Sequence, residues 1–305
     1  MSKIKYYRRK LKSQLYELGN RLLSGCGMGA SGIVNNRELR IAGLQRTGNH
    51  AVINWIFEQS PEVKCYLNCV KPDKNPYLSF ERRGTVREFQ KDFFTKFNIV
   101  AERLGRLSEK QLLIYSYEEE FLEDVFSSKK FESNHDRWVG SSSERIDMII
   151  LRDPYNLFAS RLKKEEDINA NRYSLKKAGE RETVIKIWKS YARELTGKTK
   201  IIKNKKVHVN YNKWFLDKEY RRELAAALGL EFTDSGMDQV LPIGGGSSFD
   251  RTSKDSAGTQ MKVLERWKYY KDDENFVNLF KDSELVELSE EIFGHIPDTE
   301  SLRKA

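Results

Sequence analysis

Apolar residues follow two patterns that alternate along the chain. Short continuous apolar runs predict strands over residues 39–43, 112–115, 146–151 and 206–209. Between and after them, apolar residues recur every three or four positions, which predicts helices that begin near Ala51, Phe121, Pro154, Val184, Asp217, Phe276 and Leu285. Strands that alternate with helices are typical of an α/β fold with three layers, in which a mostly parallel central sheet carries helices on both faces.

The first 36 residues predict a separate extension. Apolar residues from Ile4 to Leu22 recur at helical spacing, six Lys and Arg residues precede the first acidic residue, Glu17, and residues 25–32 (GCGMGASG) are typical of a flexible linker. A helix of this kind either docks on the main domain or lies, through residues 1–24, on an anionic membrane surface. We expect residues 37–305 to form a single domain.

Composition narrows the class of protein. The chain has 305 residues, a net charge of +9 and a pI near 9.2, which suggests an anionic partner without identifying it. A mean hydropathy of −0.68 and the lack of any apolar run of 18 residues exclude a transmembrane helix. Three cysteines and the lack of a signal peptide predict a reducing, cytoplasmic location. No second Cys/His pair follows Cys65 and Cys69 at zinc spacing, so we expect no metal site.

The loop after the first predicted strand has the spacing of a phosphate-binding turn. Gly43 and Gly48 are separated by four residues, as the glycines of a Walker A loop are. In such a loop the backbone N–H groups point inward, and the helix that follows adds the positive end of its dipole. Asn49 and His50 stand where a kinase has Lys and a magnesium-binding Ser or Thr. The cation is Arg46, whose guanidinium can bind two oxyanion oxygens at once. The loop therefore favours an anion that is transferred without a metal ion.

An Arg and a Ser follow the third predicted strand at a spacing of eight. Arg152 lies at the carboxyl end of the strand, where open α/β sheets bind their ligands. Ser160 lies about two turns into the next helix, which begins after Asp153. If the chain reverses there, the strand and helix are antiparallel and both side chains can reach one phosphate.

With this pair, the sequence resembles the 3′-phosphoadenosine 5′-phosphosulfate (PAPS)-dependent sulfotransferases over most of residues 39–293. In that family a strand-loop-helix binds the 5′-phosphosulfate, and a strand-end Arg with a Ser eight residues later binds the 3′-phosphate. The resemblance assigns the second role to Arg152 and Ser160. It assigns the first role to the loop and the helix start, through Arg46, Thr47, Gly48, Asn49, His50 and Ala51.

Three later segments resemble the same family in the same order. Tyr211 corresponds to a strand-end tyrosine that contacts the adenosine. Ser248 and Phe249 correspond to a loop whose aromatic residue packs on the adenine. Arg266 corresponds to an arginine in a segment that closes over the 3′-phosphate, although Glu265 stands where the family usually has glycine.

The resemblance leaves the catalytic base open. Many family members have a histidine at the end of the second strand, whereas this chain has the acidic run Glu118, Glu119 and Glu120. Other sulfotransferases use a glutamate, so Glu118 is the first candidate and Glu119 the second. Either carboxylate could take the proton of an acceptor hydroxyl if a cation such as Arg46 keeps it ionised. The alternative is that the run is the solvated acidic start of a helix.

The resemblance implies sulfuryl transfer from PAPS to an acceptor hydroxyl or amine, with no metal and no nucleic acid as partner. Residues 64–106 and 161–181 carry several Lys and Arg residues, which favours a glycan or another polar small molecule as acceptor. One alternative is a magnesium-dependent P-loop kinase. Another is a non-catalytic protein that binds anionic polymers through its basic N-terminal segment.

Overall fold

A computed structural model describes residues 32–60, 63–81, 99–168, 171–239, 249 and 258–303. The predicted N-terminal helix and all but the last residue of the 25–32 linker lie outside these ranges, as does Ser248. Their roles stay predictions.

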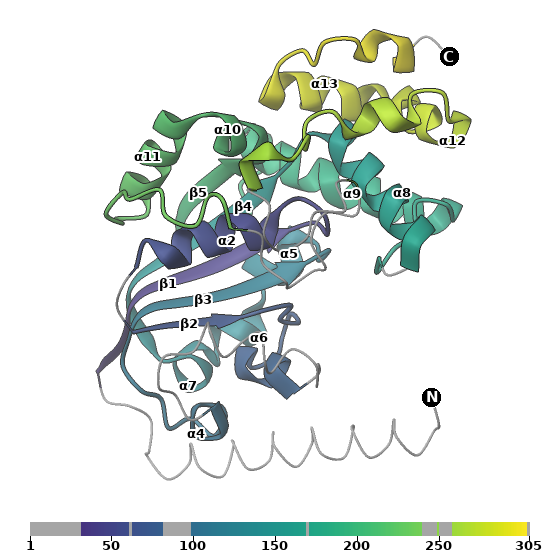
Figure 1. The fold of residues 1–305 in the computed structure, drawn as a ribbon. Coiled ribbons are helices and arrows are strands. Elements are labelled where there is room, and N and C mark those ends of the chain that lie inside the picture. Colours follow the sequence, from purple (N-terminus) through teal and green to yellow (C-terminus); the bar gives the residue numbers. More distant parts are fainter. Residues whose placement is uncertain are drawn as a thin grey trace. The chain divides into compact units, whose positions relative to one another are not determined.

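In the described part of the chain, five parallel strands form one sheet in the order β2-β3-β1-β4-β5, with helices around it (Figure 1). The strands are β1 (Ile33–Gly43), β2 (Lys64–Leu67), β3 (Lys110–Glu118), β4 (Ser141–Leu151) and β5 (Lys205–Asn210). Residues 146–151 of β4 are all buried, as is typical of a parallel strand that is covered on both faces. The predicted α/β fold with a parallel central sheet is confirmed.

The helices follow the predicted alternation with the strands. The α-helices are α2 (Asn49–Glu58), α4 (Ile99–Arg103), α5 (Leu122–Phe126), α6 (Lys129–Glu132), α7 (His135–Trp138), α8 (Pro154–Ile168), α9 (Ala178–Leu195), α10 (Tyr211–Leu216), α11 (Lys218–Ala227), α12 (Glu274–Val277) and α13 (Ser283–Phe293). The 3₁₀ helices are η1 (Pro76–Glu81), η3 (Gly258–Gln260), η4 (Arg266–Tyr270), η5 (Asn278–Lys281) and η6 (Thr299–Arg303).

The strands extend beyond the predicted ranges, and one of them was not predicted. Strand β1 begins at Ile33 rather than at residue 39, so it takes in the last residues of the predicted extension. Strand β2 was not predicted. It has four residues at one edge of the sheet, and it pairs from Lys64 opposite Leu112 to Leu67 opposite Tyr115. A run this short shows too little periodicity to be distinguished from a loop.

The described residues form two compact units, and three of the boundaries between them fall within β1, β3 and β4. The first unit contains β2, α4, α6, α7 and the starts of those three strands. The second contains their carboxyl ends, β5, α2, α5 and every element from α8 onward. All the described residues that the sequence assigns to nucleotide binding or catalysis belong to the second unit.

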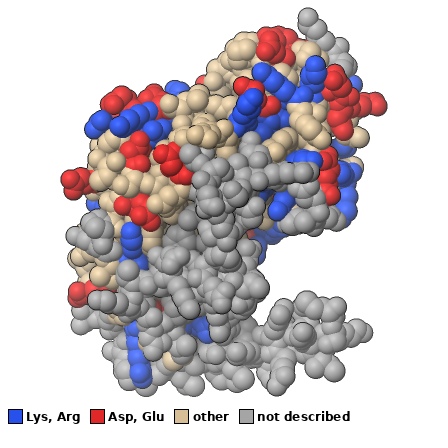
Figure 2. Space-filling view, viewed as in Figure 1, with Lys and Arg blue, Asp and Glu red and all other residues tan. Residues whose placement is uncertain are grey.

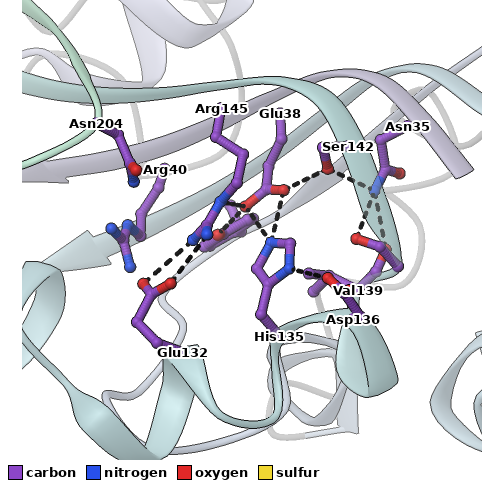
Figure 3. Close-up of polar contacts among 12 residues, drawn as sticks. Asn35, Glu38, Arg40, Glu132, His135, Asp136, Val139, Ser142, Arg145 and Asn204 are labelled. Carbon is purple, nitrogen blue, oxygen red and sulfur yellow. Dashed lines mark hydrogen bonds and ion pairs between the residues drawn. The ribbon is translucent and has the colours of Figure 1, made fainter. Parts of the chain in front are cut away.

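A buried polar network ties together four elements of the first unit, namely β1, β3, β4 and α7 (Figure 3). Glu38 of β1 is 1% exposed, and its carboxylate accepts hydrogen bonds from Tyr115 of β3 (2.5 Å), Ser142 of β4 (2.5 Å) and Nε2 of His135 in α7 (2.8 Å). The second ring nitrogen of His135 lies 2.6 Å from the Asp136 carboxylate. One buried carboxylate thus joins three other elements to β1.

In the second unit, aromatic packing and a helix pair fix the neighbourhood of the site. Trp55 of α2 contacts Trp214 of α10 edge to face, with ring centroids 6.2 Å apart. The short helix η4 packs against α8, which brings a segment from late in the chain beside the helix that follows β4. Helix α13 packs against α9.

Charged side chains of both signs are interspersed on the described surface that Figure 2 displays. None of the described helices has both the length and the apolar character that crossing a membrane requires.

Candidate functional site

The loop between β1 and α2 is a tight turn that only particular residues can form. Arg46 and Gly48 both have left-handed backbone conformations, with φ of 71° and 102°. The Asn49 side chain donates to the Leu44 carbonyl (3.1 Å) and so closes the loop on itself. A Cβ at Gly43 would lie 2.1 Å from the Asn49 side-chain oxygen, so the first glycine is required for this closure.

The start of α2 retains hydrogen-bonding capacity. Gly48 is the N-cap and supplies no side-chain acceptor for the amides of Asn49 and His50, which stand too early in the helix to have an intrahelical partner. The Thr47 amide differs, because it already donates to the Leu44 carbonyl at 3.2 Å. Within the described residues, the buried Thr47 hydroxyl has no hydrogen-bond partner. The amides at the helix start can bind an anion, whereas Thr47 offers its hydroxyl rather than its N–H.

Tyr211 packs directly on this loop. It is the first residue of α10, is 5% exposed, and its ring stacks on that of Trp214 with centroids 5.5 Å apart. A Cβ at Gly48 would lie 2.1 Å from the Tyr211 ring. On another side, the Arg152 guanidinium lies 5.3 Å from the ring centroid. The predicted adenosine contact thus lies between the two predicted phosphate-binding elements.

The Arg and Ser after β4 meet as their spacing predicts. Arg152 Nη1 donates to the hydroxyl of Ser160 (3.2 Å) and to the carbonyl of Arg46 (3.2 Å), and both Arg152 and Ser160 are buried. The chain reverses because Asp153 accepts the Asn156 amide (2.8 Å) at the start of α8. This helix start places Ser160 beside the strand end.

Arg266 reaches the same serine from the far end of the chain. Its Nη1 donates to the Ser160 hydroxyl at 3.1 Å, and its backbone N–H donates to the Asn156 side chain at 2.8 Å. Its guanidinium lies 5.4 Å from the centroid of the Phe249 ring. Arg152, Ser160, Arg266 and Phe249, predicted to act on one nucleotide, therefore lie together.

The arginines of this cluster repel one another. Burial, followed by the charge of Arg266, lowers the pKa of Arg152 to about 10. Burial and the charges of Arg266 and Arg161 lower the pKa of Arg46 to about 10 as well, against the opposing charge of Glu118. With pKa values near 10, Arg152 and Arg46 both keep their protons at neutral pH, so positive charge accumulates where little water screens it. A bound anion would relieve that cost.

The acidic run after β3 divides into residues with different surroundings. Glu118 ends the strand, is half-buried and acts electrostatically on Arg46. Glu119 is 1% exposed and forms an ion pair with Arg161, and burial raises its pKa despite that pair. Glu120 forms an ion pair with Arg172 at 2.6 Å. The run is not the solvated helix start that the alternative interpretation expected, because two of its three carboxylates are buried and paired.

The remaining predicted residues lie at the start of α2. His50 and Ala51 occupy its first turn and are both partly buried. Within the described chain, His50 Nε2 is buried without a hydrogen-bond partner. The Ala51 amide is already used, since it donates to the Gly48 carbonyl at 3.0 Å.

Several residues that shape the site were not predicted. Asn156 orients η4 through two backbone amides, those of Arg266 and Trp267. Trp188 of α9 donates to the Arg152 carbonyl at 3.0 Å. The carbonyl of Val263 accepts a hydrogen bond from Arg152. These contacts involve backbone groups, so no motif of side chains signals them.

The chain is similar to known proteins in structure but not in sequence. No protein-family model matches the chain, and no curated protein matches it. Several solved structures to which it is similar are sulfotransferases. The sulfotransferase domain of the Synechococcus PCC 7002 olefin synthase has a TM-score of 0.48 and 12% identity, covering 88% of this chain and 99% of that one.

Two further sulfotransferase structures are similar to the chain, with comparable scores and identities. Mouse sulfotransferase SULT7A1, solved in complex with PAP, has a TM-score of 0.45 and 15% identity, covering 87% of this chain and 91% of that one. The sulfotransferase domain of the curacin biosynthetic pathway has a TM-score of 0.41 and 12% identity, covering 85% of this chain and 98% of that one. At such scores the likeness says nothing about activity, which must be argued from the residues of the site.

Proposed function

We propose that this chain transfers a sulfuryl group from PAPS to an acceptor hydroxyl or amine, with a glycan as the candidate acceptor. One observation carries the proposal. Two buried arginines from distant segments, Arg152 and Arg266, donate to the same hydroxyl, that of Ser160. Such a group of donors fits the 3′-phosphate of a nucleotide, and it lies beside a loop with the spacing that suits the 5′ end.

The residues fit a nucleotide with phosphates at both ends of its ribose. Within the described residues, Arg152 Nε and the Thr47 hydroxyl are buried without hydrogen-bond partners, so both can bind oxygens of such a ligand. Arg152, Ser160 and Arg266 would hold the 3′-phosphate. Arg46 and the first amides of α2 would hold the 5′ end, which satisfies buried groups that otherwise carry a desolvation cost.

PAPS, when bound, supplies the sulfuryl group and a phosphate as leaving group. Arg46 would stabilise the negative charge that develops on the bridging oxygen as the bond to sulfur breaks. Glu118 would accept the proton of the attacking hydroxyl, because it is the half-buried carboxylate of the acidic run and the positive charge of Arg46 acts on it. Glu119 is the less suitable base, since its buried carboxylate is held by Arg161.

The deciding experiment is calorimetry with 3′,5′-ADP, PAPS and ATP with Mg²⁺. We expect 3′,5′-ADP to bind, and the Arg152→Met variant to bind it tens of fold more weakly, because a charge-assisted contact contributes about 1.5–3 kcal/mol. Thermal unfolding of the variant is the control for its fold. Unchanged affinity in that variant would remove the 3′-phosphate assignment.

The same measurement tests the two alternatives. A P-loop kinase would bind ATP with Mg²⁺, and 3′,5′-ADP would not compete. A non-catalytic binder of anionic polymers would lose binding on deletion of residues 1–30 and show steep salt dependence before that deletion. The proposal also includes a peripheral membrane contact through residues 1–24 and a cytoplasmic location.

A further inference from the structure

Arg161, the residue after Ser160, contacts both segments that carry the proposed chemistry. Its side chain is fully buried and forms the ion pair with Glu119. The same Nη1 lies 3.4 Å from the carbonyl of Gln45, to which it donates, and Nη2 donates to the carbonyl of Tyr173 at 2.6 Å. Gln45 directly precedes Arg46, and Glu119 directly follows the proposed base. One guanidinium thus connects the anion loop to the acidic run.

Arg172 connects the same two segments from a more exposed position. Its backbone N–H donates to the Gln45 side-chain oxygen at 3.0 Å. Its Nη1 donates to the Glu119 carbonyl at 3.0 Å and pairs with the Glu120 carboxylate at 2.6 Å. The Glu118 carbonyl lies 3.5 Å from the same nitrogen. The side chain is 36% exposed, so it contacts the acidic run from its solvent side.

The backbone at Glu119 needs such support. Its φ is 57°, a left-handed conformation that is unfavourable for a residue with a side chain. Its N–H donates to the carbonyl of Gly43, the first residue of the anion loop, at 3.1 Å. A strained residue persists only when its surroundings fix it, and here the two arginines supply that restraint.

We infer that Arg161 and Arg172 are positioning residues, which hold Glu118 at a fixed place relative to Arg46. The inference rests on the proposed function. Neither arginine needs to touch the substrate for this role. Arg161 is fully buried, and the hydrogen bonds and ion pairs given above for both arginines go to carbonyls, carboxylates and one side-chain amide oxygen of the chain itself. Their loss would misplace the base without removing a ligand of the nucleotide.

The test uses PAPS with water as the acceptor, so that no acceptor has to be identified. A water oxygen forms a bond to sulfur, the bond from sulfur to the 5′-phosphate oxygen breaks, and the water proton goes to Glu118. The products are sulfate and 3′,5′-ADP. Sulfate release from labelled PAPS gives kcat and KM. Calorimetric stoichiometry with 3′,5′-ADP gives the number of intact sites, to which kcat is normalised.

The main variant is Arg172→Ala, which changes a partly exposed side chain and is therefore compatible with folding. We expect kcat per intact site to fall about 10–100-fold, while KM and the affinity for 3′,5′-ADP change by less than about threefold. Arg172→Lys should recover only part of kcat, since an ammonium group can keep the Glu120 pair but not the planar donor geometry. Arg161→Lys should behave in the same way. Arg222→Ala, which removes an exposed arginine paired with Glu219, is the matched control.

The outcomes separate this inference from the proposed function. Binding of 3′,5′-ADP together with unchanged kcat in Arg172→Ala and Arg161→Lys would overturn the positioning role alone. Equal losses of nucleotide affinity and kcat would also overturn it, because the arginines would then act as ligands. If the unmodified chain does not bind 3′,5′-ADP, the proposed function fails and this inference fails with it.

Discussion

At the scale of single residues, the site depends on contacts that tolerate no added atom. Gly48 combines a φ of 102° with a Tyr211 ring 2.1 Å from where a Cβ would be. We expect Gly48→Ala to lower the free energy of unfolding by about 1–3 kcal/mol and to weaken 3′,5′-ADP binding, because the ring must move away from the loop. Denaturant unfolding and calorimetry measure the two effects.

Gly294 provides the matched control for that substitution. Its φ of 73° is also left-handed, but no atom lies within 4 Å of where its Cβ would be. Its ψ of −177° places it in a region that essentially only glycine adopts, so Gly294→Ala should cost about 1–3 kcal/mol through backbone strain alone and leave nucleotide binding unchanged. Equal effects of the two substitutions on binding would show that the Tyr211 contact does not matter.

At the scale of elements, capping fixes where helices begin. The sequence predicts a helix that begins near Asp217, and the Asp217 carboxylate accepts the amides of Glu219 (2.8 Å) and Tyr220 (3.2 Å) at the start of α11. Asp217→Ala should lower the free energy of unfolding by about 1 kcal/mol, since those amides lose their acceptor. Asp217→Asn keeps an acceptor oxygen and should cost much less. Denaturant unfolding of both variants decides the matter, and equal losses would exclude capping as the cause.

Elements that depend on local patterns could be predicted from the sequence, whereas contacts between distant segments could not. The buried run 146–151 and the spacing from Arg152 to Ser160 are local, so β4, α8 and the meeting of these side chains could be predicted. The edge strand β2 has only four residues and no distinctive periodicity. Arg161 and Arg172 act on carbonyls of distant segments, which leaves no trace in the spacing of residues along the chain.

At the scale of the whole molecule, the buried network of the first unit makes stability depend on pH on both the acidic and the alkaline side. Burial opposes ionisation of Glu38, but the hydrogen bond and charge of His135 outweigh it and lower the pKa of Glu38 to about 2, from an ordinary 4.5. Burial likewise opposes the charged form of His135, yet Glu38 raises the pKa of His135 above its ordinary 6.5. The pair is therefore charged and bonded across the acidic and neutral range.

The sign of each dependence follows from these shifts. The contribution of ionised Glu38 to the free energy of unfolding is complete above about pH 4.5 and is lost as the pH falls towards 2. The His135 contribution is complete below about pH 6.5 and is lost as pH rises through its raised pKa. We expect His135→Gln to lower the free energy of unfolding near pH 6 by at least about 2 kcal/mol, and to flatten the loss on the alkaline side. Denaturant unfolding between pH 4 and pH 9 measures both. His295→Gln, at an exposed surface pair, should leave the curve unchanged.

The contact between Gly48 and Tyr211 also restricts which substitutions this site can accept during evolution. The two residues lie in different elements, yet the ring of one fills the space that a side chain on the other would need. A side chain at position 48 is tolerable only after position 211 has become small, and a small residue at 211 leaves the anion loop without its packing partner. The order of substitutions therefore matters, and every single-step route passes through a chain with a weakened site.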